Sequence, residues 1–150
     1  MYKKIEEIYS LYTPQERERI EYAYRLAERV LKEKTRENGH PFIEHPIGVA
    51  YIVAKEIGLT ADCAEAIFLH EALRFHPTLL EELPKGQFPQ EVVDIALNLN
   101  KIAAIKPKET RLEAENYKRL IVSFSSDPRV VIIKLADRLE VMRNIALLPK

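Results

Sequence analysis

A long stretch of helical spacing that begins at Thr13 is the strongest constraint on the fold. Thr13 can cap the first amides of a helix, Pro14 suits its first turn, and Glu16 completes a capping box. Apolar residues then recur three and four positions apart, at Ile20, Ala23, Tyr24, Ala27, Val30 and Leu31. We therefore expect a helix from about residue 14 to the mid-30s, ending before Gly39 and Pro41.

Further helix starts and stops follow along the chain. Pro46 suits the first turn of a second helix, and Gly58 stands where the C-terminal cap of that helix would be. Thr60 is the expected cap of a third helix, whose inward positions are Ala64, Ile67, Phe68 and Leu69. Three more helices are expected: a short one between residues 77 and 84, one over 89–104, and one from a capping box at Thr110 to about Phe124.

The apolar run at residues 130–133 fits a buried strand or a helix, and its length decides between them. The pattern continues at helical spacing, through Leu135, Ala136, Leu139, Met142 and Ile145. Asp127 is the expected cap of this last helix, and Pro128 lies in its first turn. We expect an all-α fold of about seven or eight helices, in a single domain over residues 1–150.

Composition excludes several classes of protein. The chain has 23 Lys and Arg against 23 Asp and Glu, whereas a nucleic-acid binder usually carries a basic excess. Its single cysteine, Cys63, excludes an intramolecular disulfide and a cysteine-based zinc site. No apolar run approaches the ~18 residues of a membrane span, and the N-terminus is too charged for a signal peptide. We expect a cytoplasmic protein without nucleic-acid or membrane partners, and its oligomeric state stays open.

Asp137 is the most informative polar residue, because it interrupts the apolar spacing of residues 130–139. A carboxylate on a buried helix face is costly unless it is paired or bound to a metal. One interpretation is an ion pair with a nearby or distant basic residue. The other is a divalent cation, since two imidazoles and two carboxylates suit Mn²⁺, Fe²⁺ or Zn²⁺. The partners in that case would be His45, His70 and Glu71.

Several segments together resemble the N-terminal hydrolase domain of the RelA/SpoT proteins, a branch of the HD-domain phosphohydrolases. The segments are Arg36 to Pro46, Leu69 to Glu71, Ala114 to Leu120, Lys134 to Leu139, and Met142-Arg143. Their order and spacing agree from about residue 20 to the end. The resemblance implies an HD-domain helical bundle that removes the 3′-pyrophosphate of guanosine tetraphosphate or pentaphosphate, (p)ppGpp, with Mn²⁺.

The resemblance also implies four metal ligands: His45, His70, Glu71 and Asp137. The family's His-Asp pair is His70-Glu71 here, and the extra methylene of glutamate moves its carboxylate by about one bond. The family next places an acidic pair that handles the attacking water, and these positions are Arg74 and Phe75 here. Neither side chain can accept a proton, and a cation at Arg74 should weaken metal binding. Whether Mn²⁺ is bound here therefore stays open.

The nucleotide-binding positions are changed as well. Arg36 is retained, and Asn144 replaces a threonine but can still hydrogen-bond, so both are expected to bind nucleotide. Glu37 stands where the family often has a basic residue, and a carboxylate there should repel phosphates. The family's Arg-Leu-His-Asn-Met-Arg segment is Arg-Leu-Glu-Val-Met-Arg at residues 138–143, so Val141 replaces an asparagine that helps to hold the nucleotide.

Three functions are compatible with these residues. The replacements favour a degenerate, inactive (p)ppGpp hydrolase domain with a structural or regulatory role towards an adjoining synthetase domain. The alternative is an active metal-dependent phosphohydrolase, with Glu81 or Glu82 activating the water. The third is a helical interaction module unrelated to nucleotides. Because family hydrolase domains usually continue past the Met-Arg segment, a C-terminally truncated fragment of a longer protein is a further expectation.

Overall fold

The structure is a computed structural model that describes residues 2–103 and 127–145. Its helices are α1 (Lys3–Tyr9), α2 (Pro14–Val30), α3 (Glu44–Tyr51), η1 (Ile52–Ile57), α4 (Ala61–Phe75), α5 (Leu79–Glu82), α6 (Gln90–Ala103) and α8 (Pro128–Ile145). Within those ranges the backbone forms no strand, only an isolated bridge between Thr35 and Pro41. The expected all-α fold is confirmed, while the helix expected from Thr110 to about Phe124 lies outside the described residues. None of the described helices has the length and apolar character to span a membrane.

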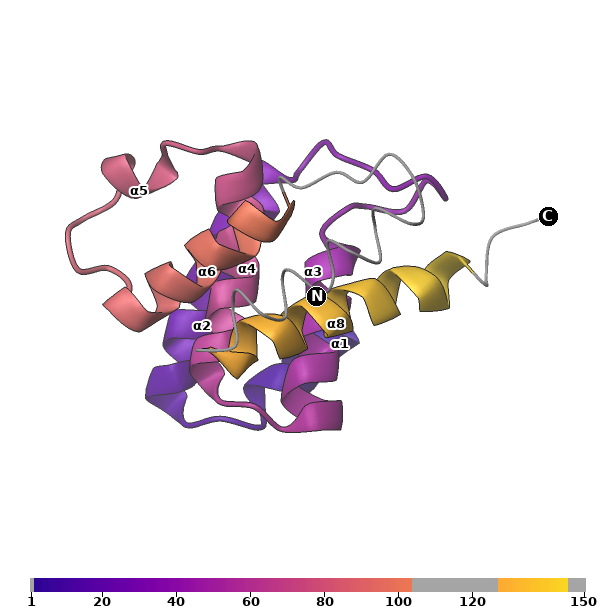
Figure 1. Cartoon of the computed structure of the whole chain (residues 1–150), viewed down its shortest axis with the longest axis horizontal. Helices are drawn as coiled ribbons and strands as arrows, with labels where there is room; N and C mark the ends of the chain where they lie inside the picture. The colour runs from indigo at the N-terminus through magenta and orange to yellow at the C-terminus, as the bar shows by residue number, and fades with distance from the viewer. Residues whose placement is uncertain (1, 104–126, 146–150) are drawn as a thin grey trace.

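Helix α4 forms the centre of the bundle. It packs against α2 and α6, which stand beside it in Figure 1, and it also contacts α3. Nearly every residue of α4 is buried, and only Asp62, Arg74 and Phe75 keep appreciable exposure. A helix that is buried on nearly all sides occupies a core position, and here it carries His70 and Glu71 into the interior.

Helix α2 begins as expected and ends earlier than expected. The backbone N–H of Glu16 donates to the Thr13 hydroxyl (3.2 Å), and that of Thr13 donates to Glu16 Oε1 (3.0 Å), which completes the capping box. The helix stops at Val30, before the mid-30s, because the chain then folds into a hairpin-like loop. In this loop the N–H of Arg36 donates to the carbonyl of His40 at 2.8 Å. The loop brings Arg36 back towards α3.

Helix α3 continues directly into the π-helical turn η1. Pro46 lies in the first turn of α3, and Gly58 ends η1 with a φ of +86°, a conformation that suits glycine. Thr60 occupies the residue before α4, but its side chain makes no capping hydrogen bond. Thr60 therefore occupies the N-cap position as expected, but the expected hydrogen bond from its side chain to the helix does not form.

Helix α8 is confirmed as a helix, but part of its expected inward face is wrong. The Asp127 carboxylate accepts a hydrogen bond from the backbone N–H of Arg129 at 3.2 Å, as expected of a cap. The buried positions are Val130, Ile133, Ala136 and Glu140, whereas Leu135, Leu139 and Met142 are exposed. The helix meets the bundle along the face that contains Asp137 and Glu140, so the leucines and the methionine turn away. In Figure 1, α8 runs across the other helices in front of α3.

Candidate metal and nucleotide site

A cleft of about 460 Å³ opens where α3, α4 and α8 meet. Its wall is formed by Arg36, Glu37, Asn38, Phe42, His45, His70, Glu71, Arg74, Lys134, Asp137, Val141 and Asn144. Of the metal-ligand, nucleotide-binding and acidic-pair positions expected from the sequence, all but Phe75 are in this wall. Three helices and the Arg36 loop, which are far apart in the sequence, therefore bring one set of polar side chains together.

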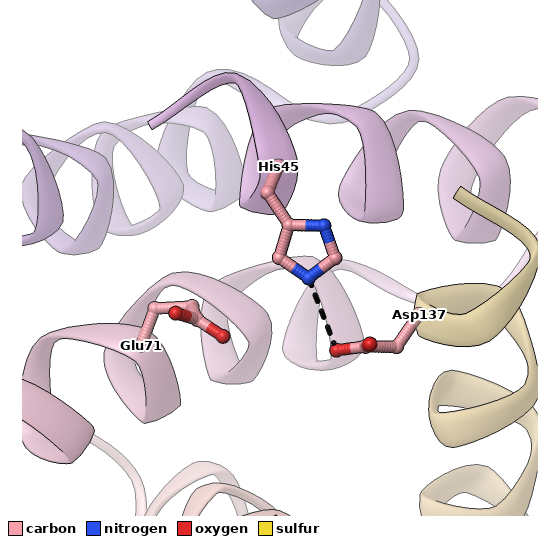
Figure 2. A group of neighbouring side chains, drawn as sticks. All are labelled: His45, Glu71 and Asp137. Carbon is pink, nitrogen blue, oxygen red and sulfur yellow. Dashed lines mark hydrogen bonds and ion pairs between the residues drawn. The ribbon is translucent and has the colours of Figure 1, made fainter. Parts of the chain in front are cut away.

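Three of the four expected metal ligands converge in the cleft. His45 from α3, Glu71 from α4 and Asp137 from α8 each offer one ligand atom, and these atoms lie within 4.8 Å of one another. Figure 2 shows the three side chains pointing towards a common space, with His45 Nε2 3.3 Å from Asp137 Oδ2. The donor set of one imidazole and two carboxylates suits a divalent cation that accepts nitrogen and oxygen ligands.

Glu71 is the member of this group whose carboxylate oxygens lack hydrogen bonds. Its side chain is 1% exposed, and neither of its oxygens accepts a hydrogen bond from the residues that the structure describes. Burial raises the pKa of Glu71, but His70, His45 and Arg74 outweigh burial and hold that pKa below its usual value. Glu71 Oε1 has His70 Nε2 at 3.1 Å and Arg74 Nη1 at 3.8 Å but no well-formed hydrogen bond, so burial of the ionised carboxylate is costly and a bound cation would reduce that cost. The residues present therefore fit a metal ion.

His70, the fourth expected ligand, lies beside the group and is not one of its three members. Its Nε2 is 3.1 Å from Glu71 Oε1, and its Nδ1 is 3.0 Å from Asn100 Oδ1. His70 is buried and lines the cleft, so it stands next to the space that the other three share. Its role as a ligand stays a prediction.

The charges of His45 and Asp137 are coupled. Burial lowers the pKa of His45, but the hydrogen bonds with Asp137 and Glu140 outweigh burial and raise the pKa to about 9. Burial raises the pKa of Asp137, and the hydrogen bond with His45 outweighs it and lowers the pKa to about 2. The two side chains form an ion pair at neutral pH, so a metal ion that binds His45 Nε2 must displace a proton.

Glu140 is a site residue that the sequence interpretation missed. Its carboxylate accepts two hydrogen bonds from Arg36, at 2.8 and 2.9 Å, one from Asn144 at 2.6 Å, and one from His45 Nδ1 at 2.5 Å. The two expected nucleotide ligands, Arg36 and Asn144, thus line the cleft but are both bound to Glu140. A glutamate one helical turn after Asp137 was the available signal, since positions three apart share a helix face.

Arg74 and Phe75, which replace the family's acidic pair, lie in different surroundings. The Arg74 side chain lines the cleft, is 46% exposed, and has Nη1 3.8 Å from Glu71 Oε1. The Phe75 ring instead packs edge-to-face against Phe42, with centroids 5.6 Å apart. Neither Glu81 nor Glu82 lines the cleft, and Glu82 is paired with His76.

Comparison with known proteins gives consistent similarities. Residues 23–150 match the HD domain family. The chain is 37% identical to guanosine-3′,5′-bis(diphosphate) 3′-pyrophosphohydrolase of Aquifex aeolicus, over 94% of this chain and 20% of that protein. It is 30% identical to the bifunctional (p)ppGpp synthase/hydrolase SpoT of Escherichia coli, over 97% of this chain and 21% of that protein. A GTP pyrophosphokinase of Streptomyces coelicolor is 35% identical over 87% of this chain and 15% of its own length. The chain thus spans about a fifth or less of the length of these relatives.

Proposed function

Because this chain belongs to the HD domain family, in its RelA/SpoT branch, we propose that it is a degenerate (p)ppGpp 3′-pyrophosphohydrolase domain. It keeps the cleft and a cation site but does not hydrolyse the nucleotide. Its proposed role is structural or regulatory, towards a synthetase domain in a longer protein. The name of the E. coli relative, a synthase and hydrolase in one chain, supports this arrangement.

Arg74 is the observation that carries the proposal. The family resemblance places a carboxylate there, and this chain places a guanidinium in the cleft wall. A guanidinium is always charged and cannot accept a proton from an attacking water. Glu71 and Asp137, two of the carboxylates in the described cleft wall, belong to the cation group, so neither is free to replace the lost proton acceptor at the position of Arg74.

A divalent cation, Mn²⁺ as in the family, is proposed for the group of His45, Glu71 and Asp137, with His70 as the fourth ligand. The orphaned oxygens of Glu71 support this assignment. When bound, such an ion supplies Lewis-acid polarisation of a phosphate oxygen. The residues of this chain would orient a nucleotide phosphate beside it, since Arg74 and Lys134 are basic and both line the cleft.

The ligand proposed for the cleft is a guanine nucleotide of the (p)ppGpp class. Guanidinium groups bind phosphates in a bidentate manner, and Arg74 is exposed enough to do so. Arg36 is already held by Glu140, so the phosphate contacts would shift towards α4 and α8. With its phosphates held by α4 and α8 in place of Arg36, the nucleotide would bind without being placed for hydrolysis.

An active phosphohydrolase remains the second candidate, and one observation favours it. His45, Glu71 and Asp137 keep metal-ligand types and converge within 4.8 Å. Glu37 also lines the cleft and is a carboxylate that could accept a proton. Glu37 is exposed and comes from the loop before α3, whereas the family's acidic pair falls on α4 beside Glu71, so Glu37 is a less direct substitute.

Incubation of the purified protein with ppGpp and Mn²⁺ tests these alternatives. We expect no release of pyrophosphate by ion-exchange chromatography, together with a rise in melting temperature on addition of ppGpp, since a ligand of the native state stabilises it. Metal-dependent release that Asp137→Ala abolishes would overturn the proposal in favour of the active enzyme. An unchanged melting temperature with ppGpp, GTP and ATP would favour the helical interaction module.

A further inference from the structure

Both histidines of the site are held through the same ring nitrogen. His45 Nδ1 lies 2.5 Å from Glu140 Oε1, and His70 Nδ1 lies 3.0 Å from Asn100 Oδ1. In both rings the opposite nitrogen, Nε2, faces the acidic side of the cleft. For His45 it is 3.3 Å from Asp137 Oδ2, and for His70 it is 3.1 Å from Glu71 Oε1.

The partners decide which nitrogen keeps a proton when Nε2 gives its own up to bind a cation. An ionised Glu140 can only accept a hydrogen bond, so His45 must donate from Nδ1. Asn100 could in principle present either its oxygen or its amide nitrogen to His70. Its Nδ2 donates to the backbone carbonyl of His70 at 3.1 Å, which turns its Oδ1 towards the ring. His70 therefore also donates from Nδ1, and Nε2 is the nitrogen left to face the cation site.

Glu140 is itself held in place on several sides. Arg36 and Asn144 occupy its carboxylate oxygens alongside His45. Its Cγ lies so close to α3 that a Cβ added at Gly48 would be 2.8 Å away. The carboxylate therefore cannot swing away from His45 without losing several contacts. Asn100 is similarly tied to α4 by two hydrogen bonds to one residue.

We infer that Glu140 and Asn100 are positioning residues, which fix the Nδ1–H form and the ring orientation of His45 and His70 so that both Nε2 atoms are directed at one site. A histidine ligand typically donates its other N–H to such a partner, and losing the partner usually weakens metal binding by about 10–100-fold. The consequence for metal affinity rests on the proposed function. The orientation of the two rings does not, because it follows from the hydrogen bonds alone.

Nuclear magnetic resonance of protein labelled with ¹⁵N-histidine tests the orientation without any metal. We expect slowly exchanging Nδ1-bound protons on His45 and His70, each assigned by its histidine variant. Glu140→Ala should remove the signal of His45 and leave that of His70, and Asn100→Ala should do the reverse. Glu140→Gln, whose amide oxygen still accepts a hydrogen bond, should retain the His45 signal. Signals that survive both alanine substitutions would overturn the inference.

Mn²⁺ affinity, measured by the electron paramagnetic resonance of the free ion, tests the consequence. We expect Glu140→Ala and Asn100→Ala each to weaken Mn²⁺ binding by about 10–100-fold. Glu140→Gln should weaken it by a smaller factor. The matched controls are Asn98→Ala on α6 and Glu56→Ala, which breaks an exposed ion pair with α8, and both should bind as the wild type does. Wild-type affinity in both test variants would overturn the positioning role while leaving the cation site intact. Wild-type protein that binds no Mn²⁺ would overturn the proposed cation site, and the proton signals would then decide the inference alone.

Discussion

Glu140 on α8 binds Arg36 through two parallel hydrogen bonds of 2.8 and 2.9 Å, across 104 positions of the sequence. Arg36 is the residue that the family resemblance assigns to the nucleotide, and the glutamate replaces a histidine of the family's motif. The charge of Arg36 is therefore neutralised inside the protein. This pair links the loop before α3 to α8, and Arg36 lines the cleft.

Removing Glu140 should destabilise the fold. Glu140→Ala leaves the Arg36 guanidinium and His45 without their buried partner, and breaking such a pair costs about 3 kcal/mol. Urea unfolding followed by circular dichroism measures the loss. The matched control is Glu56→Ala, which breaks a two-bond pair between Arg143 of the same helix and η1 at an exposed place. Equal stability of the Glu140 variant and wild type would show that the pair contributes nothing.

Gly48 should tolerate no side chain while Glu140 is present. An alanine Cβ would lie 2.8 Å from Glu140 Cγ, although alanine normally favours a helix interior by up to about 1 kcal/mol. We expect Gly48→Ala to destabilise the wild type and to be neutral or stabilising in the Glu140→Ala background. A double-mutant cycle from urea unfolding gives this coupling. Additive effects of the two substitutions would contradict the close contact.

Glu65 should make stability depend on pH. Its side chain is fully buried, and desolvation raises its pKa to about 7 although Arg19 lies 3.8 Å away. Because the pKa of Glu65 in the folded state lies above the usual 4.5, the folded protein favours the protonated carboxyl. The stability that depends on this protonated form is fully present below about pH 4.5 and is lost as the pH rises through about 7. Glu65→Gln should therefore be more stable than wild type at pH 8, by about 2–3 kcal/mol.

Thermal melting of both proteins between pH 5 and 8 measures this difference. The matched control is Asp62→Asn, which alters the other carboxylate beside Arg19 but is partly exposed. It should keep most of the wild-type dependence on pH, because Asp62 is the smallest of the causes that shift the pKa of Glu65 and burial is the largest. Parallel pH profiles for Glu65→Gln and wild type would show that Glu65 stays ionised in the folded protein.

Metal binding should strengthen with pH. His45 has a pKa raised to about 9, so below that pH a cation must displace its proton. We expect the Mn²⁺ dissociation constant to fall by about tenfold from pH 7 to pH 8, measured by isothermal titration calorimetry. Asp137→Ala should abolish binding at both values. An affinity that does not change with pH would mean that His45 is not among the ligands.

Arg74 should oppose the cation. Its guanidinium lies 3.8 Å from the Glu71 carboxylate and adds positive charge to the cleft wall. Arg74→Glu should tighten Mn²⁺ binding by about tenfold, because it replaces a repulsive charge with an attractive one. Arg29→Glu on α2, an exposed residue outside the cleft, makes the same change in net charge and should have little effect. An equal gain in Mn²⁺ affinity in both variants would show that the net charge of the protein, and not the position of Arg74, sets the effect.

Much of the fold was accessible from the sequence because its signals are local. The capping box at Thr13, the cap at Asp127 and the glycine at the end of η1 each act within a few residues, and each occurs in the structure as expected. Helical spacing likewise located α2, α4 and α6. The family resemblance named His45, Glu71 and Asp137 before the structure showed them together.

The orientation of α8 and the partners of the two histidines were decided only by the tertiary structure. Helical spacing fits two apolar faces of α8, and packing selected the one that carries Glu140, which left Leu135 and Met142 exposed. The contacts of Glu140 with His45 and of Asn100 with His70 join residues 95 and 30 positions apart. Such contacts depend on how whole helices pack, because a side chain's partner is set by the neighbouring helix and not by its own. The sequence by itself therefore determined where the helices lie along the chain and which residues could bind a metal, and the packing of α3, α4, α6 and α8 determined which atoms face the site.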